Sequence, residues 1–429
     1  MGYGTFFFIS SAEVGKITGK GLSMPECLIC KTRYEPFISF GRMPIANCFL
    51  SQEQFSEEYF FELKVGFCSS CNMVQLVEQP DRERMFHQDY AFFSSTSARM
   101  GLHFTEFADS VIKNYLKDAD PFVLEIGSND GIMLERFKKN KIRHLGIEPS
   151  SNVAQSAIAK GINTIIEFFD ERLAERIVKN HGQADAILAA NVMCHIPYLH
   201  SVASGIKALL KPEGVLIFED PYLGDIIEKT SYDQIYDEHA FYFSVESVSY
   251  LFKRYGLEVV NVEPQNVHGG SMRYTVANKG IREVSKAVFE QRAKEKNLGL
   301  HLRETFDAFR KNIEISRDHL RQLLSSIKKQ KKRIVGYAAT SKSTTVTNFC
   351  GIMPDLVEFI SDTTPIKQGK FSPGAHIPVL SYQEFSDNYP DYALLFAWNH
   401  IDEIMAKEQR FAEAGGKWIS YIPKVRILE

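Results

Sequence analysis

Apolar runs of strand length alternate with stretches of helical periodicity through the middle of the chain. The apolar runs are residues 121–127, 141–149, 163–169, 184–192 and 215–220. The amphipathic stretches between them are residues 131–140, 152–161, 170–182 and 199–214. Strands that alternate with helices through short loops are typical of a parallel sheet covered by helices on both faces. Residues 244–256 predict one more helix, and residues 257–264 and 271–278 predict two strands that complete this sheet.

A shorter version of the same alternation ends the chain. Residues 340–351 predict a turn and a helix, and the predicted strands are residues 333–339, 356–362, 376–380, 392–398 and 417–423. Between the two alternations, the highly charged segment 281–330 carries apolar residues at helical spacing. They are Phe306, Phe309, Ile313, Leu320, Leu324 and Ile327. This stripe predicts a spacer helix packed along one face, which we favour over a coiled coil.

The predicted elements divide the chain into an extension and three domains of the α/β class. We expect an N-terminal extension over residues 1–23 and a small domain with short β-like runs and paired cysteines over 24–88. A central Rossmann-like domain follows over 89–280. A helical linker and a second, smaller Rossmann-like α/β domain occupy 281–429.

Composition and charge narrow the class of protein. The chain has 429 residues, 44% of them hydrophobic, and its 50 Lys and Arg against 53 Asp and Glu give a formal net charge of −3. This composition is that of a globular protein and excludes a disordered or disulfide-stapled chain. The near-neutral charge provides no field for nucleic acid or an anionic membrane. With no membrane span and no secretory signal in the sequence, we expect a cytoplasmic protein.

Four of the seven cysteines form two CxxC pairs, Cys27 with Cys30 and Cys68 with Cys71. Each CxxC turn places two thiolates on one side of a metal ion, and two such turns complete a tetrahedral site. Four protein ligands leave no open position, so we expect a structural zinc ion. The alternative is a pair of redox dithiols, which a reducing cytosol disfavours as stable disulfides.

A loop at residues 123–131 lies where the first central strand ends and a helix begins. Gly127 allows a sharp turn, and Glu148, at the end of the next strand, can accept hydrogen bonds from ribose hydroxyls. The loop lacks a dinucleotide fingerprint and a Walker A lysine, which favours S-adenosylmethionine (SAM), with Asn129 and Asp130 at its amino group. The expected cofactor contacts are Glu125, Gly127, Ser128, Asn129, Asp130, Glu148, Pro149 and Asn191. The alternative is a Rossmann turn without a cofactor.

A loop rich in ionisable residues, 219–244, follows the fifth central strand and leaves the same edge of the sheet. Within it, His239 offers a general base, Glu238 a carboxylate to orient that base, and Tyr236 a phenol donor. The alternative is a solvated acidic loop. His195 reaches the same face from the neighbouring strand, and its residue type fits a packing role as well as a site role.

The first turn of the C-terminal α/β domain offers a second group of polar residues. Ser341, Lys342, Ser343 and Thr344 follow a strand and open a helix. Their hydroxyls, backbone N–H groups and one cation suit a diphosphate. The alternative is a degenerate Rossmann turn that only packs. Lys367 and Lys370 are left unassigned because they can be solvated.

Taken together, these segments resemble one family. The two CxxC pairs and the motifs LEIGSNDG, NVMCHIP, YDEHAFYFS, GYAATSKSTTVTNFCGI and SDTTPIKQGKFSPGAHIPV occur in this order, over nearly the whole chain. The sequence resembles the SAM-dependent sugar C-methyltransferases of deoxysugar biosynthesis. The resemblance implies a zinc-binding domain, a class I SAM methyltransferase domain and a C-terminal substrate-binding domain. It also implies a monomer whose substrate is a nucleoside-diphosphate 4-keto-6-deoxy sugar.

The resemblance also assigns catalytic residues. The base of the family falls on His239, its tyrosine and glutamate on Tyr236 and Glu238, and two further site residues on His195 and Tyr90. Phe92 and Phe93 stand where relatives often carry tyrosine, which puts sugar or phosphate contacts there in doubt.

The implied reaction starts with removal of the C3 proton next to the 4-keto group by His239. The resulting enolate then attacks the sulfonium methyl group in line, while nearby donors stabilise the charge on the keto oxygen. Two other functions stay open: O- or N-methylation of a sugar nucleotide, and a zinc- and SAM-binding protein that methylates RNA or acts as a scaffold. The sequence does not distinguish dTDP from GDP sugars, nor the stereochemistry or the pathway.

Overall fold

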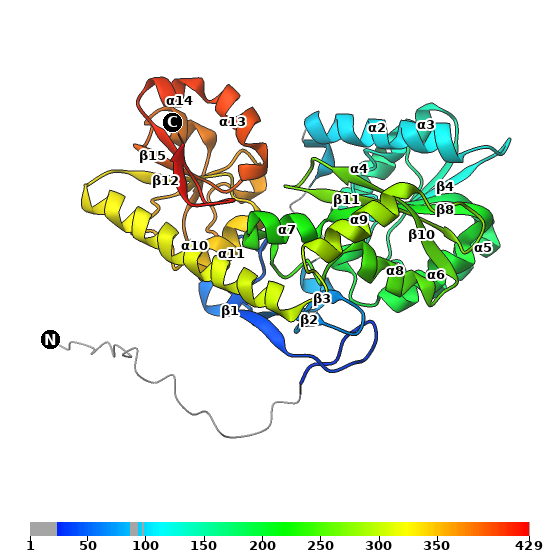
Figure 1. Ribbon diagram of the computed structural model, residues 1–429. Helices are drawn as coiled ribbons and strands as arrows, with labels where there is room; N and C mark the ends of the chain where they lie inside the picture. The colour runs from blue at the N-terminus through cyan, green and yellow to red at the C-terminus, as the bar shows by residue number, and fades with distance from the viewer. Residues whose placement is uncertain (1–23, 86–92, 97, 429) are drawn as a thin grey trace.

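The computed structural model describes residues 24–85, 93–96 and 98–428, which form three sheets (Figure 1). We name them the N-terminal, central and C-terminal sheets. The two larger sheets belong to two α/β domains that stand side by side, and the N-terminal sheet lies against both of them (Figure 1). Within the described residues, no helix is long and apolar enough to cross a membrane.

The central sheet has seven strands in the order β10-β11-β8-β7-β4-β5-β6. Their bounds are β4 (Phe122–Ile126), β5 (Arg143–Ile147), β6 (Thr164–Ile165), β7 (Ala184–Ala190), β8 (Leu210–Pro221), β10 (Leu257–Gln265) and β11 (Ser271–Asn278). The first five strands in the chain are parallel, and β11 and β10 run antiparallel at one edge. The expected parallel sheet is therefore confirmed, with an antiparallel pair completing it.

Helices cover both faces of the central sheet because successive side chains of a strand point to opposite faces. On one face, Val123 of β4 packs in a core with Phe107 of α2 (Ala98–Tyr115) and Phe137 of α3 (Leu134–Lys139). On the other face, Leu124 packs with helices α5 (Glu171–His181), α6 (Leu199–Leu209) and α8 (Val245–Lys253). The carboxyl ends of the parallel strands are left open for a site.

The N-terminal sheet contains a strand that comes from the central domain. Its order is β1 (Pro36–Pro44), β2 (Phe60–Cys68), β3 (Met73–Leu76) and β9 (Phe241–Tyr242), with every pair antiparallel. β9 follows His239 almost directly, and Val74 pairs with Tyr242. The loop that carries the candidate base is therefore anchored on the N-terminal domain, which the sequence did not indicate.

The C-terminal sheet has the order β14-β13-β12-β15-β16-β17, and all neighbours except β16 and β17 are parallel. The strands are β12 (Ile334–Tyr337), β13 (Ile360–Ser361), β14 (Val379–Leu380), β15 (Tyr392–Leu395), β16 (Lys417–Ser420) and β17 (Arg426–Leu428). α11 (Ser341–Phe349) begins just after β12, so the expected strand–turn–helix unit is confirmed.

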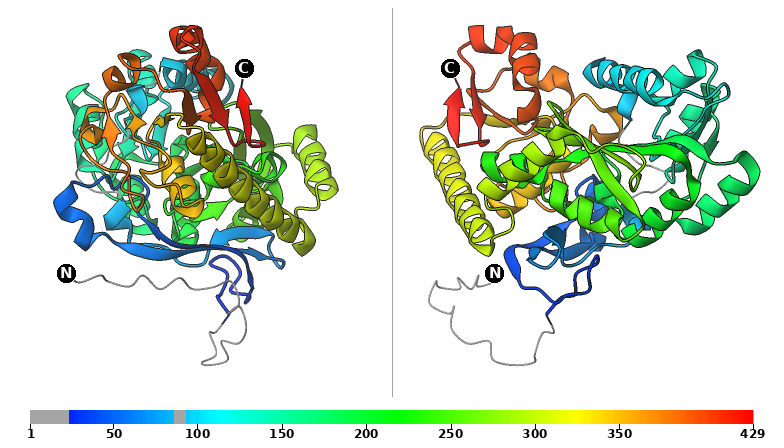
Figure 2. Two further views of the ribbon diagram at one scale, coloured as in Figure 1. Left: turned by 90° about the vertical axis from the view of Figure 1, so that its left-hand side faces the viewer. Right: turned by 45° about the vertical axis from the view of Figure 1, so that its right-hand side comes forward.

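The spacer consists of two helices rather than one. α9 (Lys286–Asn297) ends before Gly299, whose φ of +71° suits glycine, and α10 (Arg303–Lys329) begins afterwards. The apolar stripe of α10 is buried. Phe306 packs on Phe37 and Phe67, with ring centres 5.2 and 4.3 Å apart. Figures 1 and 2 show α10 running from the N-terminal sheet along the flank of the C-terminal domain, so the stripe joins two domains.

The remaining helices in the described ranges are short or cover the domain edges. They are η1 (Gln52–Glu57), α1 (Arg82–Met85), η2 (Ser94–Thr96), α4 (Ser151–Ala159), η3 (Met193–His195), α7 (Leu223–Lys229), η4 (Tyr232–Gln234), η5 (Pro365–Lys367), α12 (Tyr382–Ser386), η6 (Trp398–His400), α13 (Ile401–Lys407) and α14 (Gln409–Glu413).

Candidate active site

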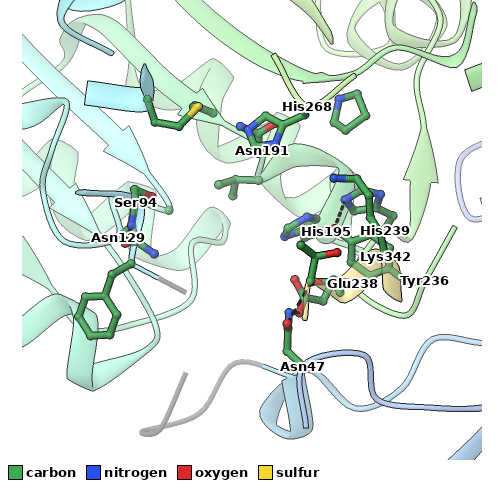
Figure 3. Close-up of a pocket in the computed structure, with 18 of the residues that line it drawn as sticks. Asn47, Ser94, Asn129, Asn191, His195, Tyr236, Glu238, His239, His268 and Lys342 are labelled. Carbon is green, nitrogen blue, oxygen red and sulfur yellow. Dashed lines mark hydrogen bonds between the residues drawn. The ribbon is translucent and has the colours of Figure 1, made fainter. Parts of the chain in front are cut away.

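A cavity of about 660 Å³ lies at the carboxyl edge of the central sheet. All three domains contribute to its lining: Asn47 comes from the N-terminal domain, Glu148 and His239 from the central domain, and Lys342 from the C-terminal domain. In Figure 3, Asn129 lies on one side of the cavity, and Tyr236, Glu238, His239 and Lys342 lie on the other.

Five of the expected cofactor contacts line this cavity: Gly127, Asn129, Glu148, Pro149 and Asn191. Gly127 has a φ of +69°, and a Cβ atom there would lie 2.3 Å from Cγ2 of Val192. Only glycine therefore fits this turn. Glu148 accepts hydrogen bonds from the backbone N–H groups of Asn129 (3.0 Å) and Ser150 (2.8 Å), which fix its carboxylate at the end of β5.

Three other expected contacts lie beneath the cavity lining rather than in it. Glu125 is part of β4 and is buried, and burial together with the nearby charges of Glu148 and Asp130 raises its pKa. Ser128 is buried as well. Asp130 accepts a hydrogen bond from the N–H of Ser95 (3.3 Å) and pairs with Lys160 (3.4 Å). These contacts hold Oδ2 of Asp130 against the loop, and its contact with the methionine amino group stays a prediction.

The lining fits SAM. Glu148 stands at the end of the strand next to the glycine turn, where a carboxylate can accept ribose hydroxyls. Asn191 lies at the end of β7, and within the described residues its buried Oδ1 atom has no hydrogen-bond donor. Buried polar atoms generally have a partner, and a bound amino group would supply one.

His239 is held so that one of its ring nitrogens can act as a base. Its Nδ1 lies 2.8 Å from the carbonyl oxygen of Gln234, which can only accept, so Nδ1 carries the proton. Its Nε2 lies 2.8 Å from the hydroxyl of Tyr236, which donates to it (Figure 3). Burial, and then the neighbouring His195, hold the pKa of His239 well below its usual range. The ring is therefore neutral at pH 7.

His195 belongs to the same cluster. Its ring stacks on His239 with ring centres 5.1 Å apart, and both rings line the cavity. Burial lowers the pKa of His195 to about 4. Of the two roles that the sequence left open, the position in the cavity favours a site role over packing alone.

Glu238 contacts the N-terminal domain, and its predicted role in orienting His239 stays a prediction. Its Oε1 accepts a hydrogen bond of 2.5 Å from Nδ2 of Asn47, and Oδ1 of Asn47 accepts one of 3.1 Å from the hydroxyl of Ser341 (Figure 3). The N–H of Ala46 donates to Asp237 (2.9 Å). The carbonyl of Gln234 takes the orienting position that we expected for Glu238. Asn47 belongs to no motif, so the sequence offered no signal for it.

The C-terminal turn contributes two of its four expected residues. Ser341 and Lys342 line the cavity. Ser343 and Thr344 are buried, and their hydroxyls donate to the carbonyls of Thr340 (2.6 Å) and Ala46 (2.9 Å). The helical period turns these two residues away from the cavity lining, and their contact with substrate stays a prediction.

A second lysine joins Lys342 in the lining. Lys367, which the sequence analysis left unassigned, donates a hydrogen bond of 2.8 Å to the carbonyl of Ala339 and lines the cavity. Burial lowers the pKa of both lysines, and Asp233 opposes the shift for Lys342. Two half-buried ammonium groups in the lining of the cavity suit an anionic ligand.

Tyr90, expected in the site, and Phe92 lie outside the described residues. Phe93 is described and lines the cavity, next to Ser94, whose N–H donates to Oδ1 of Asn129 (3.0 Å). Ser94 and Ser95 therefore contact the cofactor loop through their backbone N–H groups.

The four expected cysteines converge at the base of the N-terminal domain. The sulfur atoms of Cys27 and Cys71 are 3.5 Å apart, those of Cys30 and Cys68 are 3.4 Å apart, and all four lie within 4.8 Å of one another. A tetrahedron with bonds of about 2.3 Å separates its ligands by roughly 3.8 Å, so the sulfur atoms fit zinc. A site closed by four thiolates is structural and leaves no position for substrate.

Comparisons with known proteins match each domain. Residues 27–86 match the family described as "Putative zinc binding domain", residues 101–262 "Methyltransferase domain", and residues 266–423 "C-methyltransferase C-terminal domain". The C-methyltransferase NovU of Streptomyces niveus is 34% identical over 94% of this chain and 96% of its own length. An Escherichia coli ubiquinone biosynthesis O-methyltransferase is 28% identical over 22% of this chain and 41% of its own length.

Among solved structures, magnesium protoporphyrin IX methyltransferase from Synechocystis PCC 6803 with bound SAM is 14% identical. It aligns with 46% of this chain and 89% of its own, at a TM-score of 0.33. The match to NovU shows the family of this chain, because it spans all three domains and nearly the full length of both proteins.

Proposed function

Since the chain belongs to the SAM-dependent C-methyltransferase family, we propose that it methylates C3 of a nucleoside-diphosphate 4-keto-6-deoxy sugar. The observation that carries this proposal is the position of His239. A neutral imidazole with a fixed tautomer lines the same cavity as the cofactor residues and two half-buried lysines. That arrangement suits removal of a proton from a carbon acid next to a methyl donor.

The proposed chemistry begins with the acidity of C3. A C–H bond next to a ketone is acidic because the carbanion delocalises onto the carbonyl oxygen. Nε2 of His239 takes the C3 proton, and Nδ1 keeps its bond to the Gln234 carbonyl as positive charge builds on the ring. When bound, SAM would supply the electrophilic methyl group, whose bond to sulfur breaks as its bond to C3 forms, so that S-adenosylhomocysteine is the leaving group. The proton leaves C3, and the carbonyl re-forms as the methyl group transfers.

Neighbouring donors would stabilise the charge that develops on the keto oxygen. Tyr236 is a candidate because its hydroxyl lies 2.8 Å from Nε2 of His239. On substrate binding this O–H would turn from Nε2 to the keto oxygen, which frees the nitrogen lone pair for the C3 proton. His195 stays neutral at pH 7 because burial lowers its pKa to about 4, and a neutral imidazole can donate one hydrogen bond. Tyr90 remains a further predicted donor.

The two lysines of the lining would hold the diphosphate of the substrate. Lys342 lies in the first turn of α11, after β12, and Lys367 ends η5, after β13. Ser341 adds a hydroxyl to the lining. A diphosphate here would repay the cost of burying two ammonium groups. Whether the nucleotide is dTDP or GDP stays open, and a cytoplasmic location and a monomeric state remain predictions.

Hydrogen exchange isolates the first step of the proposed reaction. Enzyme, S-adenosylhomocysteine and a 4-keto-6-deoxy sugar nucleotide are incubated in D₂O, and mass spectrometry or NMR follows deuterium at C3. We expect wild type to exchange C3 and His239→Ala to exchange it at least about 100-fold more slowly, with SAM binding retained. Equal exchange by both enzymes would refute the role of His239.

A turnover assay then separates the proposed reaction from its alternatives. The enzyme and SAM are mixed with dTDP- and GDP-linked 4-keto-6-deoxy sugars and with the corresponding 4-hydroxy sugars. Methylation of keto sugars alone, at a quaternary carbon, supports C-transfer and identifies the nucleotide. Methylation of the 4-hydroxy sugars would point to O-transfer. No product from any sugar, with SAM bound, would redirect the search to RNA or to a scaffold role.

A further inference from the structure

Arg82 of the zinc-binding domain lies at the wall of the active-site cavity. Its guanidinium carbon is 4.2 Å from the ring centre of Phe168 and 5.1 Å from that of Tyr198. All three side chains line the cavity together with Gly127 and Glu148. A residue from outside the central domain therefore borders the pocket that fits SAM.

The strand order indicates which part of SAM faces this wall. Glu148 follows β5 and Phe168 follows β6, the next strand in the sheet, whereas Asn191 follows β7 on the far side of β4. If the ribose binds at Glu148, the adenine lies on the side of Phe168 and the methionine on the side of Asn191. Arg82 thus lies at the adenine end.

The chemistry of Arg82 suits this end of the cofactor. A planar guanidinium stacks on aromatic faces, and adenine presents one. The charge-assisted hydrogen bond from Nε of Arg82 to Glu83 (3.1 Å) fixes one edge of the guanidinium. At the neutral adenine, Arg82 also keeps its positive charge away from the sulfonium.

Arg82 contacts two separate loops of the central domain. Phe168 belongs to the loop after β6, and Tyr198 precedes α6. One side chain of the zinc-binding domain therefore contacts an aromatic ring in each loop. We propose that Arg82 is a cofactor-binding residue that closes the SAM site over the adenine ring. Binding of SAM and docking of the zinc-binding domain on the central domain then support each other.

Calorimetry with three variants tests this proposal. We expect Arg82→Ala to bind SAM about tenfold more weakly, the size of a partly buried cation–π contact. Arg82→Lys should fall between that variant and wild type, because lysine keeps the charge but loses the planar stack. The control is Arg84→Ala in the same helical turn. Arg84 is exposed, stacks on Tyr59 at 4.6 Å and is not part of the cavity lining.

Methylthioadenosine, which lacks the amino-acid half of SAM, locates the contact. We expect Arg82→Ala to weaken its binding by the same factor as that of SAM, with zinc content unchanged in every variant. Three results would overturn the proposal: wild-type SAM affinity in Arg82→Ala, an equal loss in Arg84→Ala, or a loss for SAM without one for methylthioadenosine. None of these measurements needs the sugar, so they stand apart from the proposed reaction.

Discussion

His239 is able to act as a base at neutral pH because its environment keeps the ring uncharged and keeps the proton on Nδ1. Burial and His195 lower its pKa, and the Gln234 carbonyl keeps the proton on Nδ1. The loop contains many ionisable residues. The contacts of His239 with Tyr236 and Gln234 make this histidine a proton acceptor. Residue type alone does not do this.

The lowered pKa of His239 sets the acid limit of activity. A histidine is protonated below its pKa, so a pKa well under 6.5 keeps the base neutral into mildly acidic solution. We expect the acid limb of the kcat/KM profile for the sugar nucleotide to lie below pH 6.5. His195→Asn removes a neighbour that lowers this pKa, so its acid limb should move to higher pH. A wild-type limb at or above pH 6.5 would contradict the assignment.

Asn47 is a positioning residue, since its amide joins Glu238 to Ser341 across the domains. We expect Asn47→Ala to lower kcat/KM for the sugar nucleotide by about 10- to 100-fold, because displacing a site group by about 1 Å costs that much. The thermal midpoint and SAM affinity should hardly change. Gln52→Ala, an exposed substitution in the same domain, is the control. Equal kinetics for the two variants would refute the role of Asn47.

At the scale of the elements, α9 caps α8. Glu295 of α9 is buried and accepts hydrogen bonds from the N–H groups of Val245 (2.6 Å) and Glu246 (3.2 Å) and from the hydroxyl of Tyr222 (2.9 Å). A carboxylate at a helix N-terminus satisfies donors that the helix leaves open. The spacer therefore attaches to the central domain by a polar contact as well as by packing.

Removal of this cap should destabilise the protein measurably. Glu295→Ala leaves three donors, two of them buried, without their acceptor, which costs about 2–4 kcal/mol of unfolding free energy. Glu290→Ala in the same helix breaks only an exposed pair with Lys286 and should cost less than about 0.5 kcal/mol. Urea unfolding of both variants measures the difference. Similar losses for the two would show that α9 contributes through packing alone.

At the scale of the whole molecule, local patterns predicted the two α/β domains, and long-range contacts completed the site. The alternation of strands and helices follows from side-chain periodicity, which is a local property. The strand β9, the bridge through Asn47 and the position of Lys367 depend on docking between domains. No spacing along the chain encodes such contacts, because residues far apart in sequence make them.

The same reason explains why some predicted site residues lie outside the cavity lining. Ser343 and Thr344 lie in a motif that suits a diphosphate, but the helical period turns their hydroxyls towards Thr340 and Ala46. Asp130 lies in the cofactor loop but turns to Lys160. Motif membership predicted the neighbourhood of each residue, whereas the direction of each side chain depends on packing that only the folded chain provides.

The zinc-binding domain contacts the central domain at two points that depend on its own fold. β3 begins two residues after Cys71 and pairs with β9, which follows His239. The carbonyl of Ile29, between Cys27 and Cys30, lies 2.8 Å from Nε2 of His200 in the central domain. Loss of the metal would release both contacts, because a four-thiolate site holds the fold of so small a domain.

Chelation should therefore abolish turnover before it unfolds the central domain. We expect methyl transfer to fall in proportion to the zinc released, because β9 loses its partner strand and the loop of His239 loses its anchor. Far-UV circular dichroism should keep most of its signal, and SAM affinity should fall only about tenfold, through loss of the Arg82 contact. Added Zn²⁺ should restore turnover. Cys48→Ser, at an exposed cysteine outside the tetrad, controls for thiol effects. Full turnover by zinc-free protein would show that the domain is dispensable for the reaction.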